Sequence, residues 1–232
     1  MIQHAMLRIV CISDTHGFHR KLAPPPGDIL IHAGDCLPDD RQVEALEDFN
    51  DWLGSLPYKY RVVVAGNHDL FFAKQPKQAR KQLSNAIYLE NNGVTIEGLS
   101  FWGCPITPVP DSMAFAVERG AASRKYWDKV PTETDVLVTH GPPFRVLDTE
   151  HVLAPHMGCD QLTRALLRAR PRLHVFGHVH GSYGQEAGPH GIAFVNCAVL
   201  AGLGVGRLGL REPIVVKLEN DSSVYRTYFG KS

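Results

Sequence analysis

The chain alternates between short apolar runs and polar stretches, and the apolar runs are rich in valine, isoleucine and leucine. Runs of about four to eight such residues are typical of strands that are buried on both faces. The clearest predicted strands cover residues 7–12, 28–33, 61–65, 135–139 and 173–176. Weaker runs predict further strands at 87–89, 94–96, 99–103, 192–196, 213–218 and 224–229.

Two longer segments have the spacing of an amphipathic helix instead. Apolar residues recur every three or four positions in 41–56 and again in 159–170, and Pro57 and Pro171 follow directly. A proline cannot continue a helix, so both helices are expected to end there. We also expect a short polar helix over 76–83. With 232 residues and no convincing linker, the chain is predicted to form a single domain, 1–232.

Three stretches between these elements carry less information. Asn91-Asn92-Gly93 is a turn signal between two short strand candidates, and the glycine-rich residues 202–209 are expected to form a loop. Residues 104–131 contain several prolines and aromatic residues. A segment this long is either a lid over a functional site or a packed connector with a short helix near 120–128. The sequence favours neither.

Side chains of the types that can bind metal ions follow five of the predicted strands, at the point where each strand ends. They are Asp14 and His16, Asp35, Asn67 and His68, His140, and His178 and His180. In extended backbone, residues two apart point to the same side, which favours convergence of the first pair. A carboxylate or imidazole at the end of a buried strand is costly unless it has a partner. His32, inside a strand, is expected to be a hydrogen-bonded core histidine.

The side chains at these five strand ends are of the types that bind metal ions. Ligands of open α/β sheets bind beyond the carboxyl ends of the strands. Imidazole nitrogens and carboxylate or amide oxygens without thiolates suit zinc, manganese or iron. The set is larger than one ion needs, and two ions that share a carboxylate would use all of it. Core packing is a poor alternative, because so many buried polar groups would each need a partner.

Composition and charge narrow the function classes further. Lys+Arg and Asp+Glu both number 24. The chain therefore has no excess of positive charge that would indicate binding to nucleic acid or to an anionic membrane. The five cysteines are scattered and include no CxxC pair, which favours a reducing, cytoplasmic location. We identify no signal peptide near the start of the chain and no apolar run of transmembrane length. The oligomeric state is left open.

Taken together, the five strand-end motifs resemble those of the calcineurin-like metallophosphoesterases. They are Asp14-Thr15-His16, Gly34-Asp35, Gly66-Asn67-His68-Asp69, His140-Gly141-Pro142-Pro143 and Gly177-His178-Val179-His180, in the family's order. The resemblance implies a four-layer α/β/β/α sandwich of two mixed β-sheets flanked by helices. Residues 102–108, 158–159 and 171–180 further resemble the metallophosphoesterase-domain branch, which is related to class III cyclic-nucleotide phosphodiesterases. Some animal members of that branch have Gly where this chain has His178.

The resemblance also implies a role for each residue at a centre of two divalent ions. Asp14, His16 and His180 would hold one ion, and Asn67, His140 and His178 the other. Asp35 would bridge them, with a water or hydroxide as the second bridge. His68 would contact the phosphate and protonate the leaving oxygen. Manganese is the expected metal, with iron or zinc as alternatives.

Several functions share this chemistry. The first expectation is a phosphodiesterase acting on small diesters, including cyclic nucleotides; the alternatives are a phosphomonoesterase or Ser/Thr protein phosphatase, and a non-catalytic scaffold. Protein phosphatases carry a second Asp, within Gly-Asp-x-x-Asp-Arg-Gly, where this chain has Pro38; Asp39 could take over its contact with His68. A nuclease is disfavoured by the lack of a basic run. Substrate phosphate could be contacted by Asn67, His68 and Arg145, and from a lid by Arg119 and Arg124. For these arginines, an exposed surface position is an equal alternative.

Overall fold

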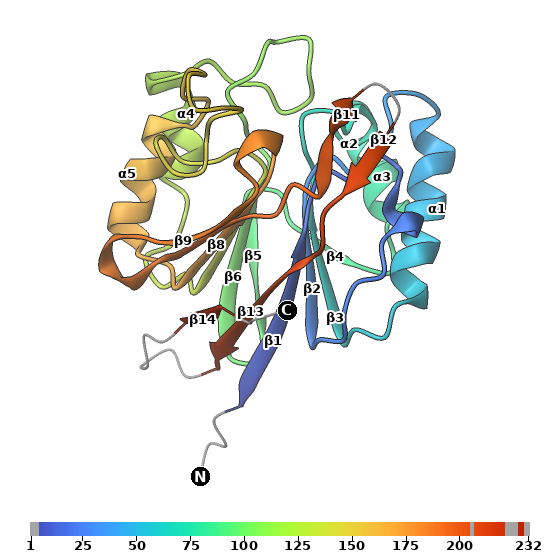
Figure 1. The fold of residues 1–232 in the computed structure, drawn as a ribbon, viewed down its shortest axis with the longest axis horizontal. Coiled ribbons are helices and arrows are strands. Elements are labelled where there is room, and N and C mark those ends of the chain that lie inside the picture. Colours follow the sequence, from blue (N-terminus) through green and yellow to red (C-terminus); the bar gives the residue numbers. More distant parts are fainter. Residues whose placement is uncertain (1–4, 205–206, 221–226, 230–232) are drawn as a thin grey trace.

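The computed structural model describes residues 5–204, 207–220 and 227–229, and its centre is a pair of six-stranded sheets packed face to face (Figure 1). The first sheet has the order β14 (Thr227–Phe229), β13 (Ile214–Glu219), β1 (Met6–Ile12), β2 (Ile29–Ala33), β3 (Tyr60–Val64), β4 (Ile87–Tyr88). The second has the order β5 (Asn92–Ile96), β6 (Leu99–Cys104), β7 (Val136–Thr139), β8 (Leu173–Phe176), β10 (Ala193–Asn196), β9 (Gly184–Ala187). Both sheets are mixed: β1 to β4 are parallel, as are β6, β7, β8 and β10, while the outer pairings β14–β13–β1, β5–β6 and β10–β9 are antiparallel.

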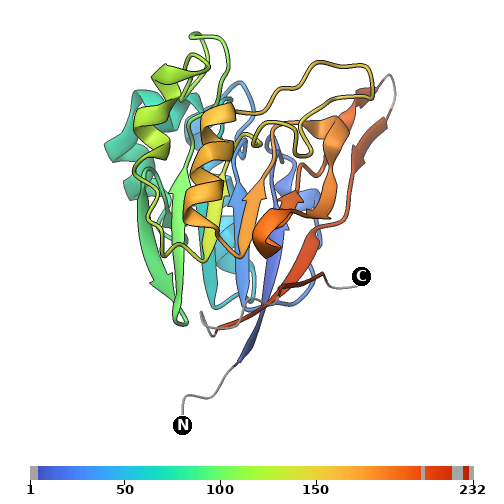
Figure 2. The same ribbon diagram turned by 90° about the vertical axis from the view of Figure 1, so that its left-hand side faces the viewer.

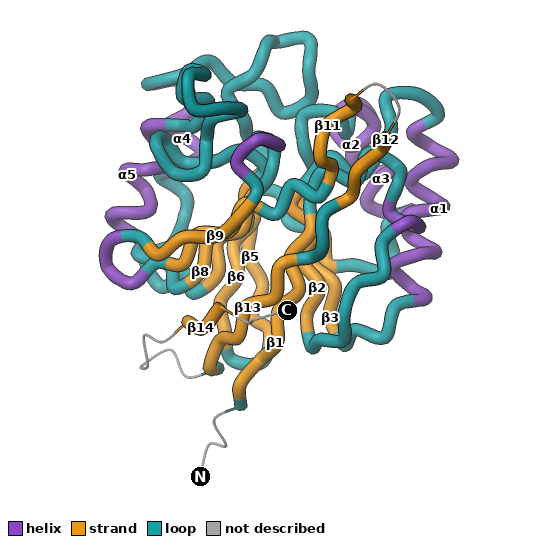
Figure 3. The backbone as a smooth tube through the Cα atoms, viewed as in Figure 1, coloured by secondary structure: helices purple, strands orange, loops and turns teal. Residues whose placement is uncertain are grey.

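Helices cover the outer face of each sheet. Those on the first sheet are α1 (Gln42–Ser55), α2 (Leu70–Lys74) and α3 (Pro76–Gln82), and those on the second are α4 (Ala121–Trp127) and α5 (Asp160–Ala169). Figure 3 shows the helices on the two outsides and the strands between them. Short 3₁₀ turns add η1 (His19–Lys21), η2 (His180–Ser182) and η3 (Pro189–Gly191). The expected four-layer α/β/β/α sandwich is therefore confirmed.

Three separate apolar layers hold the four layers of structure together. Along β1, Leu7, Ile9 and Cys11 face the second sheet, while Val10 and Ile12 face the helices. This alternation follows from the two-residue period of a strand. The residues that meet them from the second sheet include Phe101, Val136, Val138, Leu173 and Val175. Both faces of the central strands are covered, which explains why their sequences are apolar at nearly every position.

Most predicted elements are confirmed, and the differences have structural causes. The glycine-rich residues 202–209 were expected to be a loop, but this is wrong for most of them: β11 (Leu200–Gly204) pairs with β12 (Arg207–Leu210), and 205–206 lie outside the described residues. The turn at Asn91 joins no hairpin, because β4 belongs to the first sheet and β5 to the second. Of the strand expected at 224–229, only 227–229 are described and extended. β9 and α2 have no predicted counterpart.

The long segment 104–131 is a packed connector with the expected short helix. Ala114 N–H donates to the carbonyl of Asn67 at 2.9 Å, and Thr107 and Ala116 form a parallel bridge. Trp127 of α4 is 1 % exposed. The prediction for His32 is also confirmed, since its ring is fully buried and its Nε2 lies 2.9 Å from Thr15 Oγ1.

The carboxyl ends of β1, β2, β3, β7 and β8 meet along one edge of the sandwich (Figure 2). Contacts between the two sheets fix this edge: His178 N–H donates to Asp14, and the ring of His140 reaches the carbonyl of Ala33. The five strand-end motifs are therefore neighbours in space. In the described part of the chain, no helix has both the length and the apolarity to cross a membrane.

Candidate metal centre

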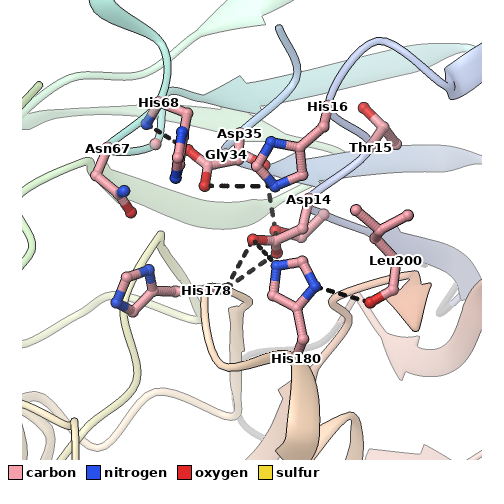
Figure 4. A network of polar contacts seen from close by, with 12 residues as sticks. Asp14, Thr15, His16, Gly34, Asp35, Asn67, His68, His178, His180 and Leu200 are labelled. Carbon is pink, nitrogen blue, oxygen red and sulfur yellow. Dashed lines mark hydrogen bonds and ion pairs between the residues drawn. The ribbon is translucent and has the colours of Figure 1, made fainter. Parts of the chain in front are cut away.

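The edge of the sandwich gathers six of the expected metal ligands into two groups. Figure 4 labels Asp14, His16, Asp35, His178 and His180 among them. Within each group, one ligand atom from every residue lies within 4.8 Å of the others. The groups are Asp14, His16 and His180, and Asp35, His140 and His178. Asn67, the seventh expected ligand, joins the second group through a contact of 2.8 Å between its Oδ1 and His140 Nε2.

Hydrogen bonds to backbone carbonyls orient two of the imidazoles. His140 donates Nδ1–H to Ala33 at 3.0 Å, and His180 donates Nδ1–H to Leu200 at 2.8 Å. The proton on Nδ1 leaves Nε2 with a lone pair in a neutral ring. In His140 this nitrogen lies 3.3 Å from Asp35 Oδ2, and in His180 it lies 3.4 Å from Asp14 Oδ1.

Acceptor atoms face one another within the second group. Around His140 Nε2 the nearest polar atoms are a carboxylate oxygen and the amide oxygen of Asn67, whose own N–H₂ is directed to Met113 Sδ at 3.3 Å. Lone pairs that converge in a buried site need a cation or a proton between them. The donor set of imidazole nitrogens with carboxylate and amide oxygens therefore fits divalent transition metals.

Asp35 belongs to the second group and also faces the first. Its Oδ1 accepts the backbone N–H of His68 at 2.8 Å, which leaves Oδ2 directed to the site. That oxygen is 3.3 Å from Nε2 of His140 and 3.8 Å from Nε2 of His16. One carboxylate oxygen thus faces a ligand of each group.

The backbone at the strand ends is left-handed, not extended as expected for Asp14 and His16. The φ angles are 56° for Asp14, 43° for His16, 54° for Asp35 and 70° for His178. Such angles cost free energy in non-glycine residues and are found preferentially at functional sites. Asp14 and His16 still converge, whereas His178 and His180, which have the same spacing, belong to different groups.

Two glycines of the motifs are required by close approach of their neighbours. A Cβ on Gly66 would lie 2.2 Å from Asp35 Oδ1, and one on Gly177 would lie 2.1 Å from Asp14 Oδ2. Any larger residue there would displace the carboxylate that it touches. Both glycines therefore serve the site by leaving space for its carboxylates.

The electrostatics of the site favour positive charge. Burial lowers the pKa of His140, but the charge and hydrogen bond of Asp35 outweigh it and raise this pKa to about 9. Burial raises the pKa of Asp14, yet the hydrogen bond from His180 and the charge of His140 outweigh it and the pKa is lowered. Burial, together with the charge of His140, lowers the pKa of His178 to about 4, so its ring is neutral and able to act as a ligand. A bound cation would satisfy the same carboxylates and leave His140 neutral.

His68 lies at the rim of the metal centre, beside His16. The two ring centroids are 5.1 Å apart, and the side chain of His68 is 34 % exposed. Its Nδ1–H donates to Asp39 Oδ1 at 2.7 Å. The contact that the sequence left open between these two residues is therefore present.

The arginines suggested as phosphate contacts have other partners. The guanidinium of Arg119 donates to the carbonyls of Met157 and Gly158, both at 2.6 Å, and Arg124 forms an exposed ion pair with Asp128. That of Arg145 lies over the ring of Phe144, 5.4 Å from its centroid. A role for Arg145 in substrate binding stays a prediction.

Two acidic residues with structural roles were missed as such from the sequence. Asp69 is fully buried and accepts the backbone N–H groups of Gly66, Asp35 and Leu37 at 2.7–2.9 Å. It closes the Gly66–Asp69 motif, which is the only local signal for it. Glu150 accepts N–H from His180 at 3.1 Å and from Gly181 at 2.8 Å, and no sequence pattern points to it.

We expect Asp69→Asn to destabilise the metal-free protein by about 2–3 kcal/mol, because an amide turns one acceptor oxygen into a donor that faces backbone N–H groups. Urea unfolding followed by circular dichroism measures the change. Asp128→Asn, at an exposed ion pair, is the control and should stay within about 0.5 kcal/mol of the parent protein. Equal unfolding midpoints and slopes for Asp69→Asn and the parent would contradict the role given to this carboxylate.

A cavity of about 520 Å³ opens beside the metal centre. Three histidines of the motifs line it, namely His16, His68 and His180. The other lining residues are Phe18, Pro38, Asp39, Asp40 and Leu200. Its volume is within the range of small-molecule sites in proteins, about 300–1,000 Å³.

Comparison with known proteins agrees with this geometry. The model of the calcineurin-like phosphoesterase family matches residues 7–182, which include all five motifs. The chain belongs to this family. Metallophosphoesterase domain-containing protein 1 of Homo sapiens is 37 % identical over 239 residues, covering 91 % of this chain and 71 % of that protein, and the Mus musculus protein of the same name matches equally. The crystal structure of TT1561 of Thermus thermophilus shares the fold, with a TM-score of 0.63 at 15 % identity over 97 % of this chain and 99 % of that one.

Membership of the calcineurin-like phosphoesterase family gives the two groups of ligands a function. The family consists of metal-dependent phosphoester hydrolases with a dinuclear centre, and this chain has two candidate metal sites at the corresponding motifs. The substrates of such enzymes are phosphate esters. Which ester this member hydrolyses is a separate question.

Proposed function

We propose that this calcineurin-like phosphoesterase is a phosphodiesterase that hydrolyses small phosphodiesters, cyclic nucleotides included. The proposal depends above all on Asp35, whose Oδ2 faces Nε2 of His140 at 3.3 Å and of His16 at 3.8 Å. A carboxylate between two ligand groups suits a ligand shared by two cations. Asp35 would bridge the ions; Asp14, His16 and His180 would hold one, and Asn67, His140 and His178 the other.

The residues of the site would have different roles in catalysis. Two divalent cations bound here would supply a hydroxide nucleophile near neutral pH and neutralise charge on the phosphoryl oxygens. His68 would contact the phosphate and protonate the leaving oxygen, and Asn67 would add a second polar contact. Asp39 accepts Nδ1–H of His68 at 2.7 Å and thereby orients the ring, with Nε2 left for the substrate. To act as the acid, the ring would carry a second proton, on Nε2, and give that proton to the leaving oxygen.

The charges of the residues that line the cavity support a preference for phosphodiesters over phosphomonoesters as substrates. Among the described residues that line it, none is Lys or Arg, whereas Asp39 and Asp40 are acidic. A monoester brings a second negative charge at neutral pH, and a diester does not. Manganese is the metal we propose, since oxygen and imidazole ligands without thiolates suit it; iron and zinc are the alternatives. The five cysteines are free and buried, which supports a reducing location such as the cytoplasm.

One observation favours a second candidate function, a phosphomonoesterase. Asp39 makes with His68 the contact for which protein phosphatases use an Asp at the place of Pro38. The departure of the sequence at Pro38 is therefore compensated one residue later. A non-catalytic scaffold has no comparable support, because all seven expected ligands and His68 are present.

The test compares a diester with a monoester that has the same leaving group. We expect metal-stripped protein to hydrolyse neither bis-p-nitrophenyl phosphate nor p-nitrophenyl phosphate, and Mn²⁺ to restore the diester reaction with a higher kcat/KM than the monoester reaction. Calorimetry with Mn²⁺ should give two ions per chain. Preference for the monoester would favour the phosphatase. Two bound ions without either activity would contradict an esterase that acts on a broad range of small substrates.

A further inference from the structure

Three of the residues that line the cavity beside the metal centre are apolar and come from three separate segments; we call them the apolar wall. Phe18 follows the Asp14–His16 motif, Pro38 follows Asp35, and Leu200 begins β11. The roles given to the metal ligands and to His68 account for the histidine side of the cavity. They leave the apolar wall unexplained.

Backbone contacts hold this wall in place. Phe18 N–H donates to the carbonyl of Thr15 at 2.7 Å, and Gly17 N–H donates to that of Cys36 at 3.0 Å. Gly17 packs against the ring of Pro38, where a Cβ would be 3.2 Å from Pro38 Cδ. Leu200 is tied to the metal centre by the hydrogen bond that its carbonyl accepts from His180 at 2.8 Å. The wall is thus preformed and adjoins the metal ligands.

We infer that Phe18, Pro38 and Leu200 bind the organic group of the substrate, and that this group is planar, aromatic and uncharged, such as a nucleobase or an aryl ring. Lys21 Nζ lies over the Phe18 ring, 4.9 Å from its centroid, so a substrate ring would pack on the part of Phe18 that Lys21 leaves open and on the aliphatic side chains. This packing gains dispersion and buried area. Asp39 and Asp40 line the same cavity and repel a further anionic group, although the exposed ion pair of Asp40 with Arg41, at 3.4 Å, offsets part of this charge. The inference rests on the proposed function, because it assumes that the metal centre holds the phosphoryl group.

Phosphonates test binding at the apolar wall separately from catalysis, because they carry no leaving group. Phenylphosphonate and methylphosphonate have the same anionic head and differ in the organic group. We expect the manganese-loaded protein to bind phenylphosphonate about ten-fold more tightly in calorimetry, the gain that burial of one ring in a modest pocket gives. In Phe18→Ala the preference should fall to about two-fold, with methylphosphonate affinity and manganese stoichiometry unchanged. Leu167→Ala, an exposed apolar residue on α5, is the matched control and should keep the full preference.

A charged probe tests the acidic rim. 4-Carboxyphenylphosphonate should bind several-fold more weakly than phenylphosphonate at low salt, and the gap should shrink as salt is added. Equal affinities of the phenyl and methyl compounds, an unchanged preference in Phe18→Ala, or tighter binding of the carboxylated compound would overturn the inference.

Failure of this inference is distinguishable from failure of the proposed function. Metal-dependent diester hydrolysis without any aromatic preference would overturn the assignment of the wall alone. Aromatic preference in a protein that hydrolyses no diester would support the wall and contradict the phosphodiesterase.

Discussion

We expect Asp35→Asn to lower manganese-dependent diester hydrolysis by about 1,000-fold or more, the scale of losing a charge that acts directly at the reacting centre. The carboxylate faces both ligand groups through one oxygen, with 3.3 Å to His140 Nε2 and 3.8 Å to His16 Nε2. The amide of asparagine keeps the size of the side chain but removes the negative charge that two cations would share. Metal binding should weaken together with catalysis.

Calorimetry and initial rates with bis-p-nitrophenyl phosphate measure the two effects of Asp35→Asn. Asp51→Asn, an exposed position on α1, is the matched control and should leave both unchanged. The variant should still fold, because its Oδ1 can accept the backbone N–H of His68 as before. Two tightly bound ions and near-normal turnover in Asp35→Asn would contradict a bridging role.

The second large effect is expected for His68→Ala, which should bind two ions like the parent protein and lose about 10²- to 10⁴-fold in kcat on a diester with a poor leaving group. His68 belongs to neither ligand group and lies beside His16, with ring centroids 5.1 Å apart. A proton donor matters most when the departing alkoxide is basic. The loss should therefore be much smaller with p-nitrophenolate, which leaves without protonation.

The dependence on the leaving group separates catalysis by His68 from a structural role. A series of phenyl diesters with leaving groups of increasing pKa should give a steeper decline of kcat for His68→Ala than for the parent. Asp39→Asn should lower kcat by about ten-fold for the leaving groups of highest pKa, because the amide accepts Nδ1–H of His68 without a negative charge. His151→Ala, an exposed histidine of a neighbouring loop, serves as control. Parallel declines in all proteins would rule out His68 as the acid.

The amino-acid sequence determined the elements of this protein and the composition of its site. Each buried strand is specified by its own apolar run, and each ligand follows its strand within a few residues, so local patterns suffice to find both. The packing of two sheets between helices was implied by the resemblance to the calcineurin-like metallophosphoesterases, and it agrees with strands that are apolar on both faces and need cover on both. The residues 202–209 were misjudged, since a glycine-rich sequence does not state whether it will pair as strands.

Only the tertiary structure decided how the ligands are grouped. His140 meets Asn67 across 73 positions of the chain, and His178 meets Asp14 across 164. No local pattern encodes such separations, and the left-handed backbone of Asp14 and His178 redirects side chains that an extended strand would align. The Asp39–His68 pair forms where the neighbouring strands β2 and β3 of the first sheet end. In the wall, Phe18 and Pro38 follow β1 and β2 of that sheet, and Leu200, which follows β10 of the second sheet, joins them only when the two sheets pack. The chemistry of the site is thus local in sequence, whereas its geometry is a product of long-range packing.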